Sequence, residues 1–262
     1  MIVEKIRQEL RKNVDHEYRN SVRKFTKKED MTQRVTYYGV KTGTVRKIAT
    51  KYYKKIDSKS KEEIFSLCDE LLELRNSEER TVAFQWAFRL RKKYEPTDFN
   101  IFESWLQNYV TGWGSCDDLC THALGYIIYR FPELVPKTQK WAISKNRWLR
   151  RAAAVTLIYS LRRKQLLEEA FETAGHLLMD GEDLVQKGYG WMLKEAANQY
   201  PEEVFQFVMD RKDTMPRTSL RYAIEKMPQE WRKKAMGRGM STLQLDVGQR
   251  PTSFCDVQPK HF

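Results

Sequence analysis

The sequence predicts an all-α protein in which helical repeats stack into a solenoid, and three observations lead to this fold class. Apolar residues recur at helical spacing almost everywhere, and no stretch sustains the alternation that a half-buried strand requires. Successive apolar segments carry a charged residue near their start at intervals of roughly 35 residues, a period typical of helical solenoids. Residues 134–167 contain no acid but nine lysines and arginines. We therefore expect a curved α-superhelix with a concave basic face.

Local start and stop signals divide the chain into helices. Ser60 with Glu63 matches a capping box and predicts a helix start. Ser77 is expected to open the next helix, and Ser115 to precede another whose first turn holds two aspartates. Proline lacks the N–H that a helix interior needs, so breaks are expected at Pro96, Pro132, Pro201 and Pro216.

The internal repeat is carried by one charged residue in each unit. These residues are Arg80, Asp117, Arg151 and Lys187. Small residues in the segments that follow would let neighbouring helices approach closely, and we expect the charged positions to line the concave face. Residues 1–236 are predicted to form a single domain. Residues 237–262, with several glycines and prolines and no helical period, are predicted to be a flexible C-terminal tail.

The charge balance points to a polyanionic partner. The 262 residues include 47 lysines and arginines against 35 acids, which gives a net charge of +12 and a pI near 9.4. Such an excess favours nucleic acid or an anionic membrane surface. No apolar run approaches the roughly 20 residues that cross a bilayer, and no signal peptide is recognisable. The four cysteines are too few for a disulfide framework, so we expect a cytoplasmic protein with reduced thiols.

Three short segments resemble the signatures of a known family. They are residues 113–117 (WGSCD), 147–153 (RWLRRAA) and 186–191 (QKGYGW), and residues 38–42 (YGVKT) resemble the family's early segment. The family is that of DNA alkylation repair, the AlkD-type alkylpurine DNA glycosylases built from HEAT-like helical repeats. The resemblance implies a HEAT-like solenoid that excises cationic alkylated purines such as 3-methyladenine and 7-methylguanine from double-stranded DNA. It also implies no cofactor, no metal and no membrane, and we expect a monomer of the bacterial type that associates with the nucleoid when it binds DNA.

The same resemblance implies the roles of individual residues. Asp117 would be the catalytic carboxylate, Trp113 and Trp191 would flank the sugar of the lesion, and Arg151 would hold the adjacent backbone. Eight further basic residues are expected to bind DNA: Arg147, Arg150, Lys187, Arg162, Arg163, Lys164, Lys41 and Arg46.

The chemistry of the reaction agrees with this set of residue types. An alkylated purine already carries a positive charge, so it leaves as a neutral base without a general acid, while the sugar becomes cationic. A fixed carboxylate stabilises such a cation and can orient the attacking water. Each indole face adds about 0.5 to 2 kcal/mol of attraction for a cation.

Each assignment has a simpler alternative. Asp117 could be a favourable charge at a helix N-terminus, either tryptophan could belong to the core, and Arg151 could be solvated. Cys116, Cys120 and His122 are close enough in sequence to suggest metal ligands, but the cysteines are more simply small core residues.

Two departures from the family pattern and two other functions stay open. Residues 114–116 (GSC) replace bulkier residues, which leaves the shape of that loop undecided, and residues 28–31 (KEDM) stand where the family often has an aromatic residue near the lesion. Tyr37 or Tyr38 would have to replace that aromatic contact. The alternative functions are a non-catalytic nucleic-acid-binding module and a helical scaffold for protein partners.

Overall fold

The computed structural model describes residues 1–25 and 35–237, and within these ranges the chain is all-α. The described residues contain no strand; one isolated backbone bridge joins Thr36 and Asn76. The predicted all-α class is confirmed. Apart from Gly237, the predicted C-terminal tail lies outside the described residues, as do residues 28–31.

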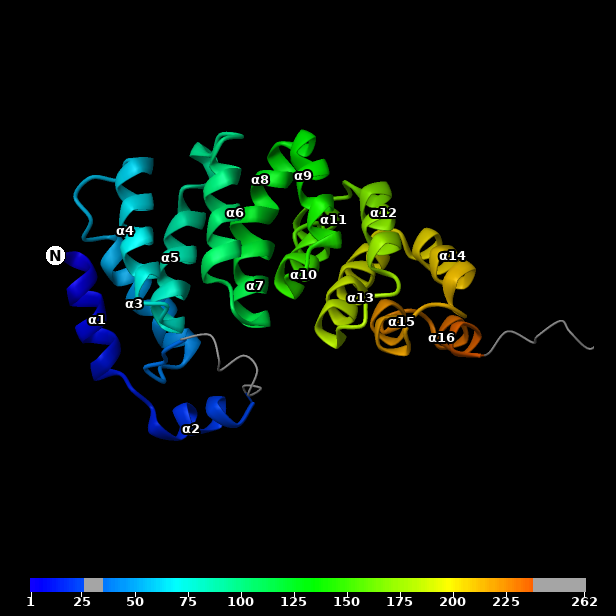
Figure 1. The fold of residues 1–262 in the computed structure, drawn as a ribbon, viewed down its shortest axis with the longest axis horizontal. Helices are drawn as coiled ribbons and strands as arrows, with labels where there is room; N and C mark the ends of the chain where they lie inside the picture. The colour runs from blue at the N-terminus through cyan, green and yellow to red at the C-terminus, as the bar shows by residue number, and fades with distance from the viewer. Residues whose placement is uncertain (26–34, 238–262) are drawn as a thin grey trace, which may run out of the picture.

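The helices follow the chain from α1 to α16 along the long axis of the molecule (Figure 1). Their bounds are α1 Ile2–Lys12, α2 His16–Phe25, α3 Thr42–Tyr53, α4 Lys61–Glu73, α5 Ser77–Arg89, α6 Asp98–Tyr109, α7 Trp113–Leu119, α8 Gly125–Arg130, α9 Val135–Gln139, α10 Arg147–Val155, α11 Ile158–Leu161, α12 Leu167–Leu177, α13 Asp183–Ala197, α14 Pro201–Arg211, α15 Arg217–Ile224 and α16 Gln229–Met236. A π-helical turn, Cys120–Leu124, joins α7 to α8, and short 3-10 helices span Arg91–Lys93, Pro132–Leu134 and Lys140–Ile143.

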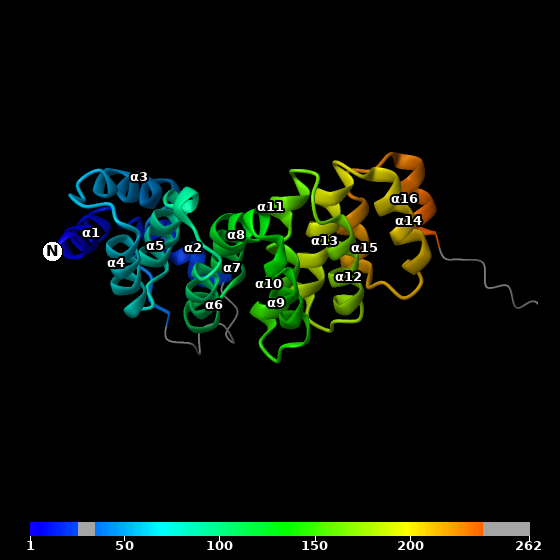
Figure 2. The same cartoon turned by 90° about the horizontal axis from the view of Figure 1, so that it is seen from above.

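Five helices form a row of direct neighbours through the middle of the array. We call α5, α7, α10, α13 and α15 the central row, because each of them packs against the next. Each also packs against a helix that precedes it in the chain: α4, α6, α9, α12 and α14. The view from above shows the same succession from one end to the other (Figure 2). None of the described helices is both long enough and apolar enough to cross a membrane.

The predicted internal repeat corresponds to this central row. Arg80, Asp117, Arg151 and Lys187 lie within the first five residues of α5, α7, α10 and α13. We expected all four to line the concave face. For Arg80 and Arg151 this is wrong, because they are only 6% and 5% exposed and therefore line no open surface. Nη1 of Arg80 donates to the carbonyl oxygen of Tyr109, 2.6 Å away, at the end of α6. A buried guanidinium that satisfies a helix-end carbonyl has a structural role.

Helix starts agree with the sequence signals at two of three places. The Ser60 hydroxyl accepts a hydrogen bond from the Glu63 N–H at 3.1 Å and caps α4. Helix α5 begins at Ser77, although its capping side chain is that of Asn76. Three of the prolines stand at helix starts and Pro96 lies between α5 and α6, so the expected breaks are confirmed.

The third expected start was wrong by three residues. Helix α7 begins at Trp113, so Ser115 lies inside its first turn, where the Ser115 hydroxyl donates to the carbonyl oxygen of Gly112 at 2.9 Å. The backbone of Gly112 is extended and takes the N-cap position without a capping side chain. The two aspartates therefore follow the first turn of α7, which holds no acid.

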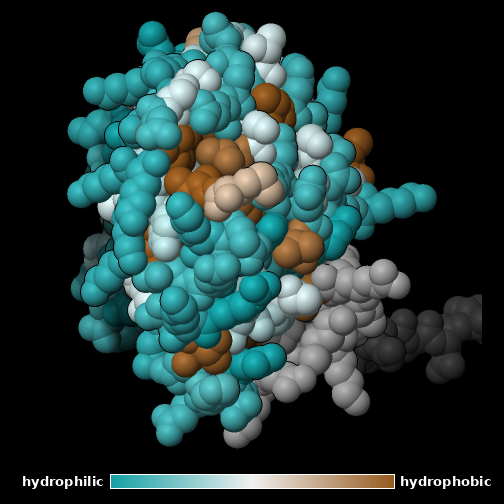
Figure 3. Space-filling view, turned by 90° about the vertical axis from the view of Figure 1, so that its left-hand side faces the viewer, coloured by the Kyte–Doolittle hydropathy of each residue, from teal (hydrophilic) through white to brown (hydrophobic). Residues whose placement is uncertain are grey.

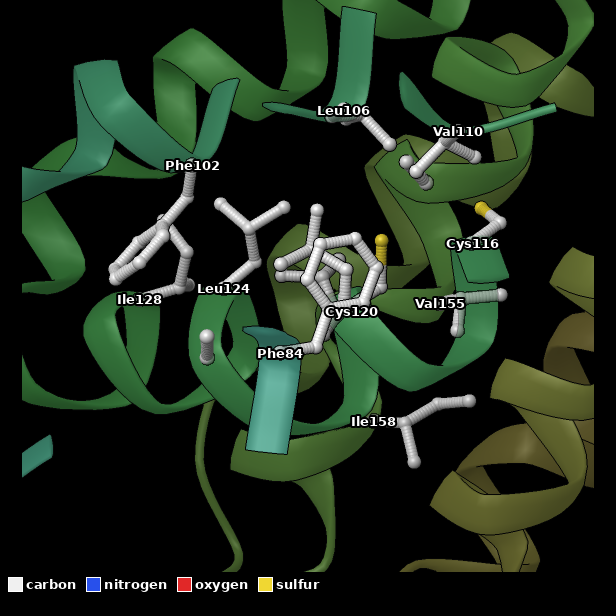
Figure 4. Packing of buried hydrophobic residues seen from close by; sticks show 14 of the residues in the cluster. Phe84, Phe102, Leu106, Val110, Cys116, Cys120, Leu124, Ile128, Val155 and Ile158 are labelled. Carbon is white, nitrogen blue, oxygen red and sulfur yellow. The ribbon is translucent and has the colours of Figure 1, made fainter. Parts of the chain in front are cut away.

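An apolar core behind α7 fixes the position of this helix. Figure 4 shows Phe84 of α5, Phe102 and Leu106 of α6 and the two sulfur atoms of Cys116 and Cys120 gathered together. Both cysteines are fully buried and are free thiols, and burial raises the pKa of Cys116. Their place in the core confirms the apolar reading of this pair.

The segment that precedes α3 is held by a buried carboxylate of α5. Glu78 accepts hydrogen bonds from the backbone N–H groups of Tyr38, Gly39 and Val40, at 3.2, 2.7 and 3.0 Å. The Tyr38 hydroxyl donates to Glu79 at 2.6 Å. These contacts anchor the N-terminal part of the array to the central row. The N-terminal end itself shows a group of apolar side chains within a largely hydrophilic surface (Figure 3).

Candidate functional site

The centre of the candidate site is an ion pair between two neighbouring helices of the central row. Asp117 is the fifth residue of α7, and Arg151 is the fifth residue of α10. Nε of Arg151 donates to Oδ1 of Asp117, and Nη2 donates to Oδ2, both at 2.8 Å. Two parallel hydrogen bonds between planar groups fix the orientation of the carboxylate as well as its position.

The guanidinium of Arg151 is itself held from a third helix. Its Nη1 donates to the carbonyl oxygen of Leu184 in the first turn of α13. Burial disfavours the charged guanidinium, but the hydrogen bonds and charge of Asp117 outweigh it and raise the pKa of Arg151. Asp117 occupies the Nε–Nη2 edge of the Arg151 guanidinium. That edge is therefore not available for the expected contact with a DNA phosphate.

Asp117 remains accessible beside this anchor. Its side chain is 18% exposed, whereas that of Arg151 is 6% exposed. A carboxylate oxygen has several acceptor directions, so two donated hydrogen bonds leave capacity for a further partner. The pair can therefore present negative charge to a bound molecule while Arg151 stays behind it.

Trp113 lies one helical turn before Asp117 and on the same side of α7. Residues four apart in a helix are neighbours on its surface. The Trp113 side chain is 60% exposed, which excludes the alternative that it is a core residue. An indole left in solvent beside a buried ion pair is available to a ligand.

Trp191 is half-buried and packs against the core. Its Nε1 donates to Oε1 of Glu195, one turn later in α13, at 2.9 Å. Nε of Arg162 donates to the other oxygen of Glu195 at 3.0 Å. Although burial opposes it, these two hydrogen bonds lower the pKa of Glu195. Glu195 was not among the residues predicted from the sequence. Its position four residues after Trp191 would have indicated it, because residues four apart in a helix are neighbours.

Asp118 forms a second ion pair on the other side of α7. Its Oδ1 lies 3.0 Å from Nη2 of Arg46 in α3 and 3.3 Å from Nδ1 of His122. Burial raises the pKa of Asp118, and the charges of Arg46 and His122 act against that rise. The two adjacent aspartates thus bind arginines from two different helices, α3 and α10, which argues against the alternative that they only complement the N-terminus of α7.

Most of the residues expected to bind DNA are paired within the protein. Six of the eight lie within 4 Å of a carboxylate, in the pairs Lys41–Asp15 at 2.7 Å, Arg46–Asp118 at 3.0 Å, Arg147–Glu182 at 3.6 Å, Arg150–Asp180 at 2.6 Å, Arg162–Glu195 at 3.0 Å and Lys187–Asp183 at 2.7 Å. Each pair lowers the local positive field, so the attraction for a polyanion is smaller than a count of basic residues suggests.

The other two expected DNA-binding residues lie together after α11. The guanidinium carbon of Arg163 is 3.6 Å from the ring centroid of Tyr159. Lys164 is exposed, and within the described part of the chain it has no carboxylate partner. Both residues follow α11, whereas Arg151 lies in α10, so these two cations belong to a different segment from the Asp117–Arg151 pair.

The residues considered for metal binding do not come together as ligands. In residues 1–25 and 35–237, no three histidine, cysteine or acidic side chains are grouped so that they could hold an ion. Nδ1 of His122 lies 2.8 Å from the carbonyl oxygen of Asp118, and Cys116 and Cys120 point into the core.

The chain matches a protein family in sequence and a solved structure in fold. A family model described as DNA alkylation repair enzyme matches residues 6–227. The chain is also similar to a solved structure described as a predicted DNA alkylation repair enzyme from Enterococcus faecalis. That match has a TM-score of 0.70 and 15% sequence identity, and covers 83% of this chain and 98% of the other, so it supports the fold. No curated protein sequence matches the chain.

Proposed function

Because the chain belongs to the DNA alkylation repair enzyme family, we propose that it is a DNA glycosylase that hydrolyses the N-glycosidic bond of cationic alkylated purines in duplex DNA. The substrates would be lesions such as 3-methyladenine and 7-methylguanine, and the reaction would begin base excision repair. The observation that carries the proposal is the accessible Asp117 carboxylate, held by Arg151 and flanked by the exposed Trp113.

The reaction needs charge stabilisation more than proton transfer. The C1′–N9 bond breaks and its electron pair goes to the purine, which was already cationic and leaves neutral. The sugar is left with oxocarbenium character, and Asp117 stabilises it electrostatically. A water molecule, oriented by Asp117, then forms the new C1′–O bond and releases its extra proton to the solvent.

The ion pair with Arg151 weakens this stabilisation without abolishing it. A sugar cation about 4 Å from the carboxylate gains about 4 kcal/mol at an effective dielectric constant of about 20. A guanidinium on the far side, about 8 Å from the sugar, costs about 2 kcal/mol of repulsion. The net gain of about 2 kcal/mol corresponds to about a thirtyfold rate increase. In exchange, Arg151 holds Asp117 in one orientation, so no energy is needed to orient it during the reaction.

The array would supply the surface for DNA. We propose that residues 1–236 form a single HEAT-like solenoid, that the central row lines its concave face, and that the protein acts as a monomer. Trp113 and Trp191 would lie on either side of the sugar of the lesion. The eight basic residues would contact phosphates, among them Arg163 and Lys164 after α11 and Lys187 in α13.

The proposal is tested by excision from methylated duplex DNA, with the freed bases analysed. The wild-type protein should release 7-methylguanine or 3-methyladenine, and Asp117→Asn should lose most of that activity and still bind DNA. Asp180→Asn is the matched control, since Asp180 has 7% side-chain exposure and pairs with Arg150 in the same manner. Full activity of Asp117→Asn would remove the carboxylate from the mechanism, and equal losses in both variants would assign the effect to stability.

The second candidate function is a non-catalytic nucleic-acid-binding module. The pairing of Asp117 with Arg151 favours it, because a structural ion pair needs no catalytic purpose. If this function is correct, neither the wild-type protein nor Asp117→Asn frees a base. Asp117→Asn then binds duplex DNA more tightly than wild type, because a negative charge has been removed from the binding face. A protein scaffold, the third alternative, would show negligible affinity for duplex DNA at moderate salt.

A further inference from the structure

A glycine of α13 lies directly against the side chain that holds Asp117. A Cβ atom built on Gly188 would be 3.1 Å from Cγ and 3.3 Å from Nη1 of Arg151, and 3.6 Å from Cγ2 of Val155. The first two distances are shorter than ordinary contacts between carbon and its neighbours. Gly188 is buried in the interior of a helix, where glycine is less stable than alanine. The space that a larger side chain would need at this position is taken by Arg151, which accounts for the glycine.

Arg151 has little freedom to move away from such a Cβ. Its three guanidinium nitrogens all donate hydrogen bonds, two to Asp117 and one to the carbonyl oxygen of Leu184. Leu184 precedes Gly188 by one turn of α13, so the guanidinium lies along the helix surface between them. A shift of a few tenths of an ångström would lengthen at least one of these hydrogen bonds.

We infer that Gly188 is a positioning residue for the proposed reaction: its missing side chain lets Arg151 lie close against α13 and hold the Asp117 carboxylate in one orientation. The inference rests on the proposed function for its catalytic consequence. Its structural part, that the 188 side chain sets the geometry of Arg151, stands independently of any activity.

Two other helical glycines serve as matched controls. A Cβ on Gly175 of α12 would meet no atom within 4 Å. A Cβ on Gly190 of α13 would lie 2.7 Å from Cβ of Tyr222 and 2.9 Å from the carbonyl oxygen of Ser219. Gly175 thus reports the gain in helix propensity alone, and Gly190 reports a clash between α13 and α15 that does not involve Arg151.

The experiment compares Gly188→Ala, Gly175→Ala and Gly190→Ala in the full chain. We would measure the melting temperature, the affinity for undamaged duplex, the single-turnover excision rate, and the NMR signal of the Arg151 Nε–H group, identified by its loss in Arg151→Lys. We expect Gly188→Ala to melt near the wild-type temperature, to bind duplex as well as wild type, and to excise at least about tenfold more slowly, with a shifted Nε–H signal. Gly175→Ala should keep the wild-type rate and signal, and Gly190→Ala should melt at a lower temperature.

Several outcomes would overturn the inference. An unchanged rate and an unchanged Nε–H signal in Gly188→Ala would show that Arg151 tolerates the added Cβ, and a slower rate with an unchanged signal would assign the loss to another cause. If Gly188→Ala fails to fold, the double variant Arg151→Ala, Gly188→Ala is compared with Arg151→Ala alone. A double variant as stable as Arg151→Ala supports the clash with Arg151, and one less stable than Arg151→Ala refutes it. An inactive wild-type protein would refute the proposed function alone, since the NMR signal still tests the geometry.

Discussion

The ion pair between Asp117 and Arg151 should be worth several times more to stability than an ordinary surface pair. The test is a double-mutant cycle with Asp117→Ala, Arg151→Met and the double variant. Alanine and methionine remove the interaction without introducing a new polar partner, which the cycle requires.

The expected magnitude follows from burial and geometry. The two side chains are 18% and 6% exposed and share two hydrogen bonds of 2.8 Å. A hydrogen bond to a charged group contributes about 1.5 to 3 kcal/mol, and breaking a buried pair costs about 3 to 5 kcal/mol. With a discount for the exposure of Asp117, the coupling free energy should be about 2 to 4 kcal/mol.

A second cycle on Arg162 and Glu195 provides the reference within the same protein. Those side chains are 48% and 12% exposed and share a hydrogen bond of 3.0 Å. An exposed pair of this kind contributes about 0.2 to 1 kcal/mol. The pair therefore differs from Asp117–Arg151 mainly in exposure and in the number of hydrogen bonds.

Urea unfolding of each variant measures the free energy of unfolding, with equal m-values as the check that the unfolding reaction is unchanged. A coupling energy for Asp117 and Arg151 no larger than that of the reference pair would refute the reasoning. The carboxylate would then be loosely held, and its catalytic orientation would need another explanation.

Three further predictions test other parts of the structure. Gly39→Ala should destabilise the protein by more than about 1 kcal/mol in thermal unfolding, because φ is +93° and the new Cβ would lie 2.5 Å from Cβ of Arg19. The control Gly43→Ala should not, because a Cβ there would meet no atom within 4 Å. The pKa of Glu195 is lowered in the folded protein, so its contribution to the free energy of unfolding is complete above the unfolded pKa and is lost as the pH falls through the folded pKa. Glu195→Gln should therefore lose less stability than wild type between about pH 6 and pH 3, and an identical loss would contradict this. Lys164→Ala should reduce the slope of log K for DNA against log salt by about 0.9 in binding titrations, and an unchanged slope would mean that this lysine contacts no phosphate.

Local signals in the sequence were sufficient for most of the secondary structure. The Ser60 cap, the start at Ser77 and the proline breaks agree with the structure because capping and helix breaking depend on a few adjacent residues. The start of α7 differed because Gly112, which has no side chain to signal a cap, takes the N-cap position ahead of Ser115. The register of the internal repeat was also visible, since it depends only on spacing along the chain.

The sequence by itself determined the all-α class, the positions of the repeats, and through its signatures the DNA alkylation repair family. It could not determine which cations are available to a partner. Only the tertiary structure decided that Arg151 faces Asp117 and Leu184 instead of solvent, and that six of the eight expected DNA contacts already have carboxylate partners. The physical reason is that, apart from Lys187 and Asp183 within α13, these partners come from separate segments of the chain, most of them about 30 residues or more apart in sequence. Their meeting depends on how the helices rotate and pack.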